Sequence, residues 1–228
     1  MRQIIALGGG GFSMEPENLL LDRYILKQCK KRKPKICFIG TASGDAEGYI
    51  EQFYKSFRLE SCEPTHLSLF KPHTRNIKEF IMKQDIIYVG GGNTKNLMVL
   101  WRDWELDVAI RQAYDQGTIL AGLSAGSLCW FEEGVTDSYG SGLEPISCMG
   151  ILRGSHCPHY DGEEARRPAY QALIQEGIIV SGYAADDGVG LHFIDEELHS
   201  IVSSRPKAHG YRVDKEKETQ LSTKYLGL

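Results

Sequence analysis

The sequence predicts an α/β fold built on a doubly wound, mostly parallel sheet. Short apolar runs alternate with segments of helical periodicity as far as residue 130, which is the pattern of parallel strands joined by crossover helices. Glycine-rich turns follow the first, fourth and fifth of these runs. Right-handed crossovers would bring all three turns to one edge of the sheet, where open α/β folds bind their ligands.

The strands and helices of this sheet are predicted from the spacing of apolar residues. Short, mostly apolar runs are typical of strands buried on both faces. The predicted strands are Gln3–Leu7, Lys35–Gly40, Pro64–Phe70, Asp85–Val89 and Thr118–Ala121. Helical spacing and basic helix ends predict the intervening helices. These are Glu17–Lys31, Ala46–Phe57, Ile77–Met82, Lys95–Leu100 and Leu106–Tyr114, with another beginning in Leu128–Phe131.

The C-terminal part of the chain follows a different pattern. A helix is expected at Ala165–Glu176 and a strand at Ile178–Ser181. The runs Gly190–Ile194 and His199–Val202 flank a polar triplet and therefore predict a β-hairpin. Gly210–Val213 predicts one more strand, and a charged, solvated tail follows over 214–218. Because no linker, internal repeat or low-complexity segment interrupts the chain, we predict one domain over residues 1–228.

Composition and charge argue against several function classes. The formal net charge is −4, and the one basic cluster, Lys30–Lys33, is expected to end a helix, so the sequence does not favour nucleic-acid binding. No apolar stretch approaches the roughly 18 residues of a membrane span. Gly8–Gly11 interrupts the first apolar run, which argues against a signal peptide. The six cysteines include no Cys-x-x-Cys pair, so we expect reduced thiols and a cytoplasmic protein.

The most informative motif is Gly122-Leu123-Ser124-Ala125-Gly126, which follows the fifth predicted strand. A serine between two glycines at a strand-to-helix turn is a nucleophile elbow, where the turn is too tight for large neighbouring side chains. The hydroxyl is held outward, and the N–H of Ala125 can stabilise an oxyanion. The alternative interpretation is an ordinary glycine-rich turn in which Ser124 caps a helix.

A nucleophilic serine needs a base, and the sequence offers seven histidines for this role. The histidines at positions 66, 73, 192 and 199 lie in predicted strands and turns, where a structural role is expected. His156 and His159 lie instead in Ser155–Gly162, a segment bounded by proline and glycine that we predict to be a functional loop. The spacing of His156, Cys157, His159 and Asp161 matches no standard zinc pattern, so neither a metal nor a cofactor is expected.

Three motifs carry a family resemblance. They are Gly90-Gly91-Gly92-Asn93-Thr94, Gly122-Leu123-Ser124-Ala125-Gly126-Ser127 and Pro158-His159-Tyr160-Asp161. In this order they resemble the dipeptidase E family, the α-aspartyl dipeptidases related to cyanophycinase, over residues 1–205. The resemblance implies a flavodoxin-like fold and a serine peptidase that cleaves dipeptides with an N-terminal aspartate. The expected partner is then a small peptide substrate, with a homodimer as one possible assembly.

The resemblance also assigns roles to residues. It implies that Ser124 is the nucleophile and His159 the base. One oxyanion N–H would belong to Gly91 or Gly92, and the other to Ala125. The neighbouring Asn93 and Thr94 would belong to the substrate-binding region.

The acid that orients His159 is left open by the sequence. The family's acid has been placed at positions that match Asp187 or Asp137, and we favour Asp187, with Asp186 as a third choice. An arginine after the histidine is thought to hold the substrate's aspartate side chain in this family, which implies Arg166 or Arg167. A guanidinium suits this task because its planar fork binds a carboxylate through two hydrogen bonds.

Three other functions compete with this hypothesis. An α/β-hydrolase would use its triad in the order Ser124, Asp187, His209, but no His-Gly-Gly-Gly motif precedes the elbow. Class I glutamine amidotransferases have a similar elbow with cysteine as the nucleophile, and Ser124 argues against a working copy. A non-catalytic nucleotide-binding module would use the turn Gly8–Gly11, but Ser13 stands at the third glycine position of that fingerprint.

Overall fold

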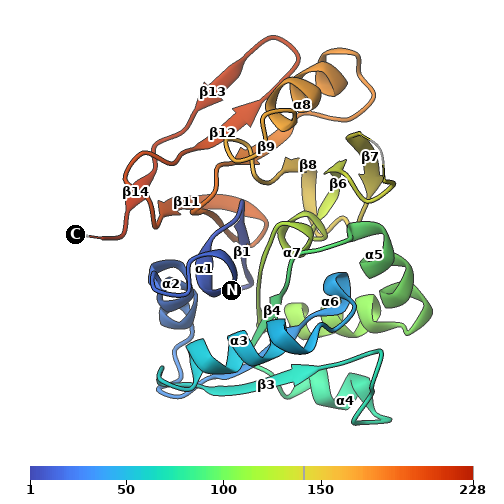
Figure 1. Cartoon of the computed structure of the whole chain (residues 1–228), viewed down its shortest axis with the longest axis vertical. Helices are drawn as coiled ribbons and strands as arrows, with labels where there is room; N and C mark the ends of the chain where they lie inside the picture. Colours follow the sequence, from blue (N-terminus) through green and yellow to red (C-terminus); the bar gives the residue numbers. More distant parts are fainter. Residues whose placement is uncertain (141, 228) are drawn as a thin grey trace.

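The structure is a computed structural model, and it describes residues 1–140 and 142–227. In the described part of the chain the strands form two sheets (Figure 1). The larger sheet has the strand order β14-β11-β10-β1-β5-β4-β2-β3. Its strands are β1 (Gln3–Leu7), β2 (Lys35–Ile39), β3 (Glu63–Leu67), β4 (Ile86–Val89), β5 (Ile119–Leu123), β10 (Val189–Ile194), β11 (Glu197–Ser203) and β14 (Lys224–Tyr225).

The larger sheet confirms the predicted mostly parallel core. All five predicted strands form, and β3, β2, β4, β5 and β1 pair in parallel. The third strand ends at Leu67, earlier than predicted, because the backbone N–H groups of Leu69 and Phe70 donate to the Asp45 carboxylate instead of extending the ladder. The predicted hairpin forms as β10, which pairs antiparallel with β1, and β11, which pairs antiparallel with β10.

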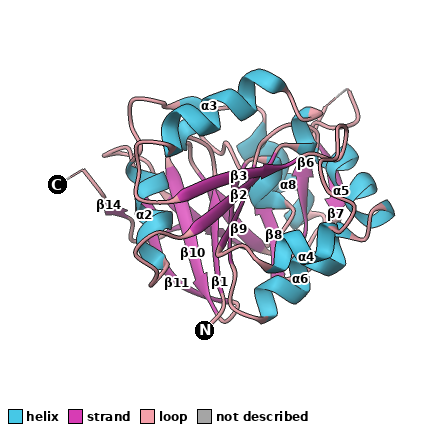
Figure 2. Cartoon of the chain, turned by 90° about the horizontal axis from the view of Figure 1, so that it is seen from below, coloured by secondary structure: helices cyan, strands magenta, loops and turns pink. Residues whose placement is uncertain are grey.

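Helices cover both faces of this sheet, as a doubly wound fold requires. Alternate residues of β1 enter two separate apolar clusters: Ile5 and Leu7 pack toward α2 and α3, whereas Ile4 and Ala6 pack toward α5 and α6. Figure 2 shows α3 on one side of β2 and β3, with α4 and α6 on the other. The helices are α1 (Gly11–Met14), α2 (Leu20–Gln28), the 3-10 turn η1 (Thr41–Ser43), α3 (Glu47–Phe57), α4 (Ile77–Met82), α5 (Thr94–Asp103) and α6 (Leu106–Asp115).

A second sheet combines strands that precede the hairpin in the chain with two that follow it, and of these the sequence predicted only β12, at Gly210–Val213. Its order is β13-β12-β9-β8-β6-β7, and Figure 1 shows it beside α8 (Arg166–Gln175), above the larger sheet. Its strands are β6 (Phe131–Thr136), β7 (Glu144–Ser147), β8 (Leu152–Cys157), β9 (Gly182–Ala185), β12 (Gly210–Val213) and β13 (Glu218–Gln220). An apolar cluster containing Phe131 and Leu152 of this sheet also contains Leu191 of the larger sheet, so the core is continuous between them.

Two predictions in this region are wrong. The helix expected at Leu128–Phe131 is only the end of the one-turn helix α7 (Ala125–Leu128), and Phe131 already begins β6. The strand expected at Ile178–Ser181 does not form, and β9 runs over Gly182–Ala185 instead. A Cβ added to Gly182 would lie 1.9 Å from the carbonyl oxygen of Ser155 on β8, so close strand packing selects glycine over β-branched residues.

None of the helices in the described residues is long and apolar enough to cross a membrane.

Candidate active site

Ser124 stands at a sharp turn between β5 and α7. Its φ of 54° and ψ of −118° lie in a region that side-chain-bearing residues rarely adopt. The turn closes because its flanks are glycines: a Cβ on Gly122 would lie 2.3 Å from the Gly126 carbonyl oxygen. A Cβ on Gly126 would lie 2.1 Å from the carbonyl oxygen of Val89. This local geometry is that of a nucleophile elbow.

His159 and Asp187 form a buried pair. His159 follows β8, Asp187 follows β9, and the His159 Nδ1 atom lies 2.6 Å from Asp187 Oδ1. Their side chains are 13% and 10% exposed. The first glycine turn makes room for the pair, since a Cβ on Gly9 would lie 2.1 Å from Asp187 Oδ1 and 2.9 Å from His159 Nδ1. The segment Ser155–Gly162, which was predicted to be a loop, begins as a strand, because β8 continues to Cys157.

The end of β1 brings the serine and the histidine together. The Ser124 N–H donates to the Leu7 carbonyl at 3.2 Å, and the His159 N–H donates to the next carbonyl, of Gly8, at 3.1 Å. Two consecutive residues of one strand end thus hold the two backbones. Ser124, His159 and Asp187 therefore lie at the same carboxyl edge of the sheets.

The electrostatics of the pair fix its protons. Burial raises the pKa of Asp187, but the hydrogen bond and charge of His159, followed by the charges of Arg205 and Arg166, lower that pKa below its ordinary value. Asp187 is therefore ionised at neutral pH and can only accept hydrogen bonds. In the neutral imidazole the proton must then lie on Nδ1 of His159, which leaves Nε2 with a lone pair that can take a proton.

The sequence analysis assigned no role to the further residues that contact Asp187. Its N–H donates to Asp161 Oδ1 at 2.7 Å, and its Oδ2 atom lies 3.9 Å from Arg205 Nη1. Arg205 Nε in turn donates to Glu15 Oε1 at 2.8 Å. Arg205 and Glu15 belong to no motif and are separated by most of the chain, so only the folded structure reveals this contact.

The other carboxylates considered as the acid lie elsewhere. Asp137 is 66% exposed and lies 3.8 Å from Arg166 Nη2 rather than on His159. Asp186 Oδ2 accepts hydrogen bonds from the His209 backbone N–H at 2.9 Å and the Tyr211 hydroxyl at 3.3 Å. Burial raises the pKa of Asp186. Of the three, Asp187 is the carboxylate bonded to His159, and the Asp187–His209 contact of the α/β-hydrolase alternative is absent among the described residues.

Backbone N–H groups of the elbow and of the second glycine turn are the candidates for an oxyanion hole. A Cβ on Gly91 would lie 3.3 Å from Ser124 Cβ, so the second glycine turn contacts the elbow. The Gly91 N–H itself donates to the Tyr49 hydroxyl at 3.2 Å. Among the described residues, the N–H groups of Gly92 and Ala125 have no hydrogen-bond acceptor. Of the two glycines, Gly92 is therefore the one whose N–H is not already bonded within the protein.

Asn93 and Thr94 use their polar groups within the protein. Asn93 Oδ1 accepts the Asn96 N–H at 2.8 Å and so caps α5, while its Nδ2 donates to the Ser138 carbonyl at 3.0 Å. The Thr94 N–H donates to Ser138 Oγ at 2.8 Å, and its side chain is buried. Both residues therefore help to fix the loop next to the elbow.

The two arginines differ in burial and partners. Arg166 is 4% exposed, and its guanidinium forms two hydrogen bonds with Glu163, at 2.6 and 3.2 Å. Arg167 is 45% exposed, pairs with Glu218 of β13 and lies over two tyrosine rings. Arg167 therefore joins α8 to the second sheet, whereas the charge of Arg166, after that of Arg205, helps to lower the pKa of Asp187.

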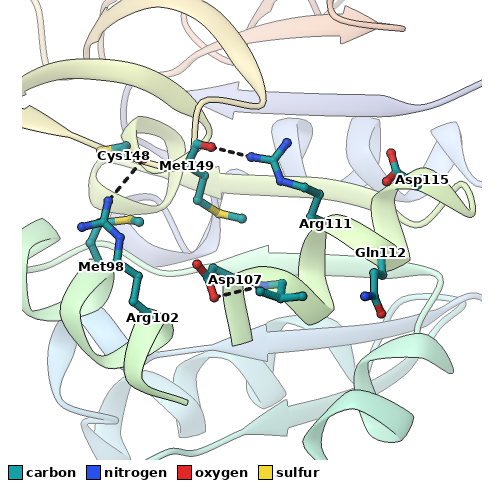
Figure 3. A pocket seen from close by; sticks show the side chains of 9 residues that line it. Met98, Arg102, Asp107, Arg111, Gln112, Asp115, Cys148 and Met149 are labelled. Carbon is teal, nitrogen blue, oxygen red and sulfur yellow. Dashed lines mark hydrogen bonds between the residues drawn. The ribbon is translucent and has the colours of Figure 1, made fainter. Parts of the chain in front are cut away.

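A pocket of about 380 Å³ lies away from these residues (Figure 3). It is lined by α5, α6 and the segment after β7, and its two arginines, Arg102 and Arg111, donate to the carbonyl oxygens of Cys148 and Met149. None of the predicted site residues lines it. The candidate active site is instead the convergence of the elbow, the two glycine turns and the His159–Asp187 pair.

A serine on an elbow at the carboxyl edge of an α/β sheet, with a histidine–aspartate pair on the same edge, defines a serine hydrolase. Sequence comparison narrows the class, because the model of peptidase family S51 matches residues 4–201. The chain belongs to this family of serine peptidases.

Individual relatives agree with this assignment. The chain is 56% identical to the "Uncharacterized peptidase YgaJ" of Bacillus subtilis (strain 168) over 231 residues, which cover all of both chains. The crystal structure of a peptidase from an acI-B1 Actinobacterium has a TM-score of 0.69 at 18% identity and covers 98% of this chain and 95% of its own. A putative peptidase E protein from Listeria monocytogenes EGD-e has a TM-score of 0.59 at 16% identity and covers 97% and 100%. These two structures share the fold.

Proposed function

We propose that this peptidase hydrolyses short peptides, above all dipeptides with an N-terminal aspartate, by an acyl-enzyme mechanism that uses Ser124, His159 and Asp187. The main support is the hydrogen bond from His159 to Asp187. In addition, the backbones of His159 and Ser124 are both hydrogen-bonded to the end of β1. This arrangement suits nucleophilic catalysis, since it supplies a nucleophile, a base and a carboxylate that fixes the base's tautomer.

The proposed reaction follows from these positions. His159 Nε2 takes the proton of Ser124 as the hydroxyl oxygen attacks the scissile carbonyl carbon. The N–H groups of Gly92 and Ala125 stabilise the resulting oxyanion. The imidazolium, stabilised by ionised Asp187, gives its proton to the leaving amine. Water then attacks the acyl-enzyme with His159 again as base, which releases the free acid and restores Ser124.

The proposed specificity rests on Arg166. A buried guanidinium favours a carboxylate ligand because the charge-assisted, two-pronged hydrogen bond is stronger where water is excluded. In the structure the guanidinium of Arg166 is bound by the carboxylate of Glu163, whose side chain is 46% exposed. A substrate aspartate would bind Arg166 by displacing or joining this side chain, so the specificity depends on competition between two carboxylates.

A dipeptide panel tests the proposal. Purified protein is assayed on Asp-X, Glu-X, Asn-X and Leu-X, with an N-blocked Asp-X peptide and the Ser124→Ala variant as controls. We expect the highest kcat/KM for Asp-X, little cleavage of the blocked peptide and none by the variant. Cleavage of esters or of internal peptide bonds without a free amino group would favour the α/β-hydrolase-type alternative.

A further inference from the structure

A second, buried histidine contacts segments that carry the candidate active-site residues. His156 is fully buried in β8, three residues before His159. Its Nδ1 atom lies 3.0 Å from the Tyr183 carbonyl oxygen and its Nε2 atom lies 3.1 Å from Ser127 Oγ. The ring also stacks on Phe131, with ring centroids 4.6 Å apart and planes at 13°. Both nitrogens and one face of the ring are therefore fixed.

His156 and its two hydrogen-bond partners lie in the three segments that adjoin the residues of the proposed triad. Ser127 lies in α7, three residues after Ser124. His156 itself lies on β8, which leads to His159, and Tyr183 lies on β9, which leads to Asp187. We propose that His156, acting through Ser127, is a positioning residue that holds the nucleophile, the base and the acid in register. This inference rests on the function proposed above.

The protons of this contact can be assigned. The Tyr183 carbonyl only accepts, so Nδ1 of His156 carries the proton and donates it. Burial lowers the pKa of His156 to about 3, so the ring is neutral at physiological pH and Nε2 is an acceptor. Ser127 Oγ also lies 2.8 Å from the Ser124 carbonyl oxygen. The Ser127 hydroxyl donates to this oxygen, and His156 Nε2 is a second acceptor 3.1 Å away, so the two acceptors share its one proton.

The contact reaches the reacting groups through one peptide unit. The Ser124 carbonyl and the Ala125 N–H belong to the same planar peptide. Because Ser127 closes the turn onto that carbonyl, the direction of the proposed oxyanion donor depends on where Ser127 is held. A displacement of about 1 Å in such a site can cost about a hundredfold in rate. Loss of the His156–Ser127 contact should therefore lower the rate of chemistry more than it lowers substrate binding.

Two variants and a matched control test this role. Ser127→Ala removes one hydroxyl, and His156→Phe keeps an aromatic ring without its nitrogens. His192→Phe is the control, because His192 is also buried and bonded at both nitrogens, to Tyr24 and Gln3, but lies outside the site. kcat and KM are measured on the preferred dipeptide well below each variant's Tm.

We expect Ser127→Ala and His156→Phe to lower kcat at least tenfold, with KM changed less than about twofold. His192→Phe should lower Tm while kcat stays within twofold of wild type. The inference is overturned if Ser127→Ala keeps the wild-type kcat, and this variant decides the case should His156→Phe fail to fold. An inactive wild type that does not react with a fluorophosphonate would instead refute the proposed function.

Discussion

Replacing Asp187 by asparagine probes the proposed mechanism with almost no change of shape. In the native site Asp187 Oδ1 accepts the His159 Nδ1 proton at 2.6 Å, and Oδ2 lies 3.9 Å from Arg205 Nη1. The asparagine amide would turn its oxygen toward the Arg205 cation and its NH₂ toward His159. Nδ1 would then have to accept, the ring proton would move to Nε2, and the base would be lost.

The expected loss follows from the tautomer. In serine proteases an aspartate-to-asparagine change of this kind lowers kcat by about four orders of magnitude. We expect a loss of about 10³–10⁴ in kcat for Asp187→Asn, equivalent to about 4–5.5 kcal/mol of transition-state stabilisation. Steady-state hydrolysis of the preferred dipeptide measures the loss, and a thermal melt checks folding.

Asp137→Asn is the matched variant, because Asp137 is the other carboxylate that the family resemblance offers. Its side chain is exposed and lies near Arg166 rather than His159, so we expect an effect below about threefold on kcat. A loss under tenfold for Asp187→Asn, or a larger loss for Asp137→Asn, would refute the assignment of the acid.

Three further predictions concern the base, the specificity and the stability. His159→Ala should abolish hydrolysis whereas His209→Ala should retain most of it; the reverse result would support the α/β-hydrolase triad. Arg166→Ala should lower kcat/KM for Asp-X at least tenfold but affect Leu-X far less, and Arg167→Ala should change neither; equal losses on both peptides would contradict a carboxylate site. Asp22 is buried with a pKa raised to about 7, mainly by burial. Its unfolded-state pKa lies near 4, so the unfolded state releases this proton first as pH rises. Stability should therefore fall by a few kcal/mol between about pH 4 and pH 7 and be flatter in Asp22→Asn, as measured by urea unfolding; identical pH profiles would contradict this.

The parallel core could be predicted because its signals are local. Alternation of apolar runs and helical spacing located the strands from Gln3 to Leu123, and glycines marked the turns that meet at Ser124. The tight contacts of Gly122 and Gly126 explain why the elbow motif is so informative. Because only glycine fits at such positions, glycines in the sequence indicate where two backbone segments pack closely.

Apart from β12, at Gly210–Val213, the second sheet could not be predicted because its strands lack strong intrinsic signals. β9 is Gly182–Ala185, which contains no β-branched residue, and it forms because Ser155 on β8 approaches Gly182 closely. The contacts of Arg205 with Glu15 and Asp187 likewise depend on chain segments far apart in sequence. A single sequence gives no sign of which distant charges will meet.

The central claim is that Ser124 is a nucleophile activated by His159. Its most direct test is the rate at which a fluorophosphonate labels the protein, with the modified residue located by mass spectrometry of peptides. We predict one adduct, on Ser124, that is absent in Ser124→Ala and forms at least a hundredfold more slowly in His159→Ala. Labelling at another residue, or equal rates in the wild type and His159→Ala, would contradict the account.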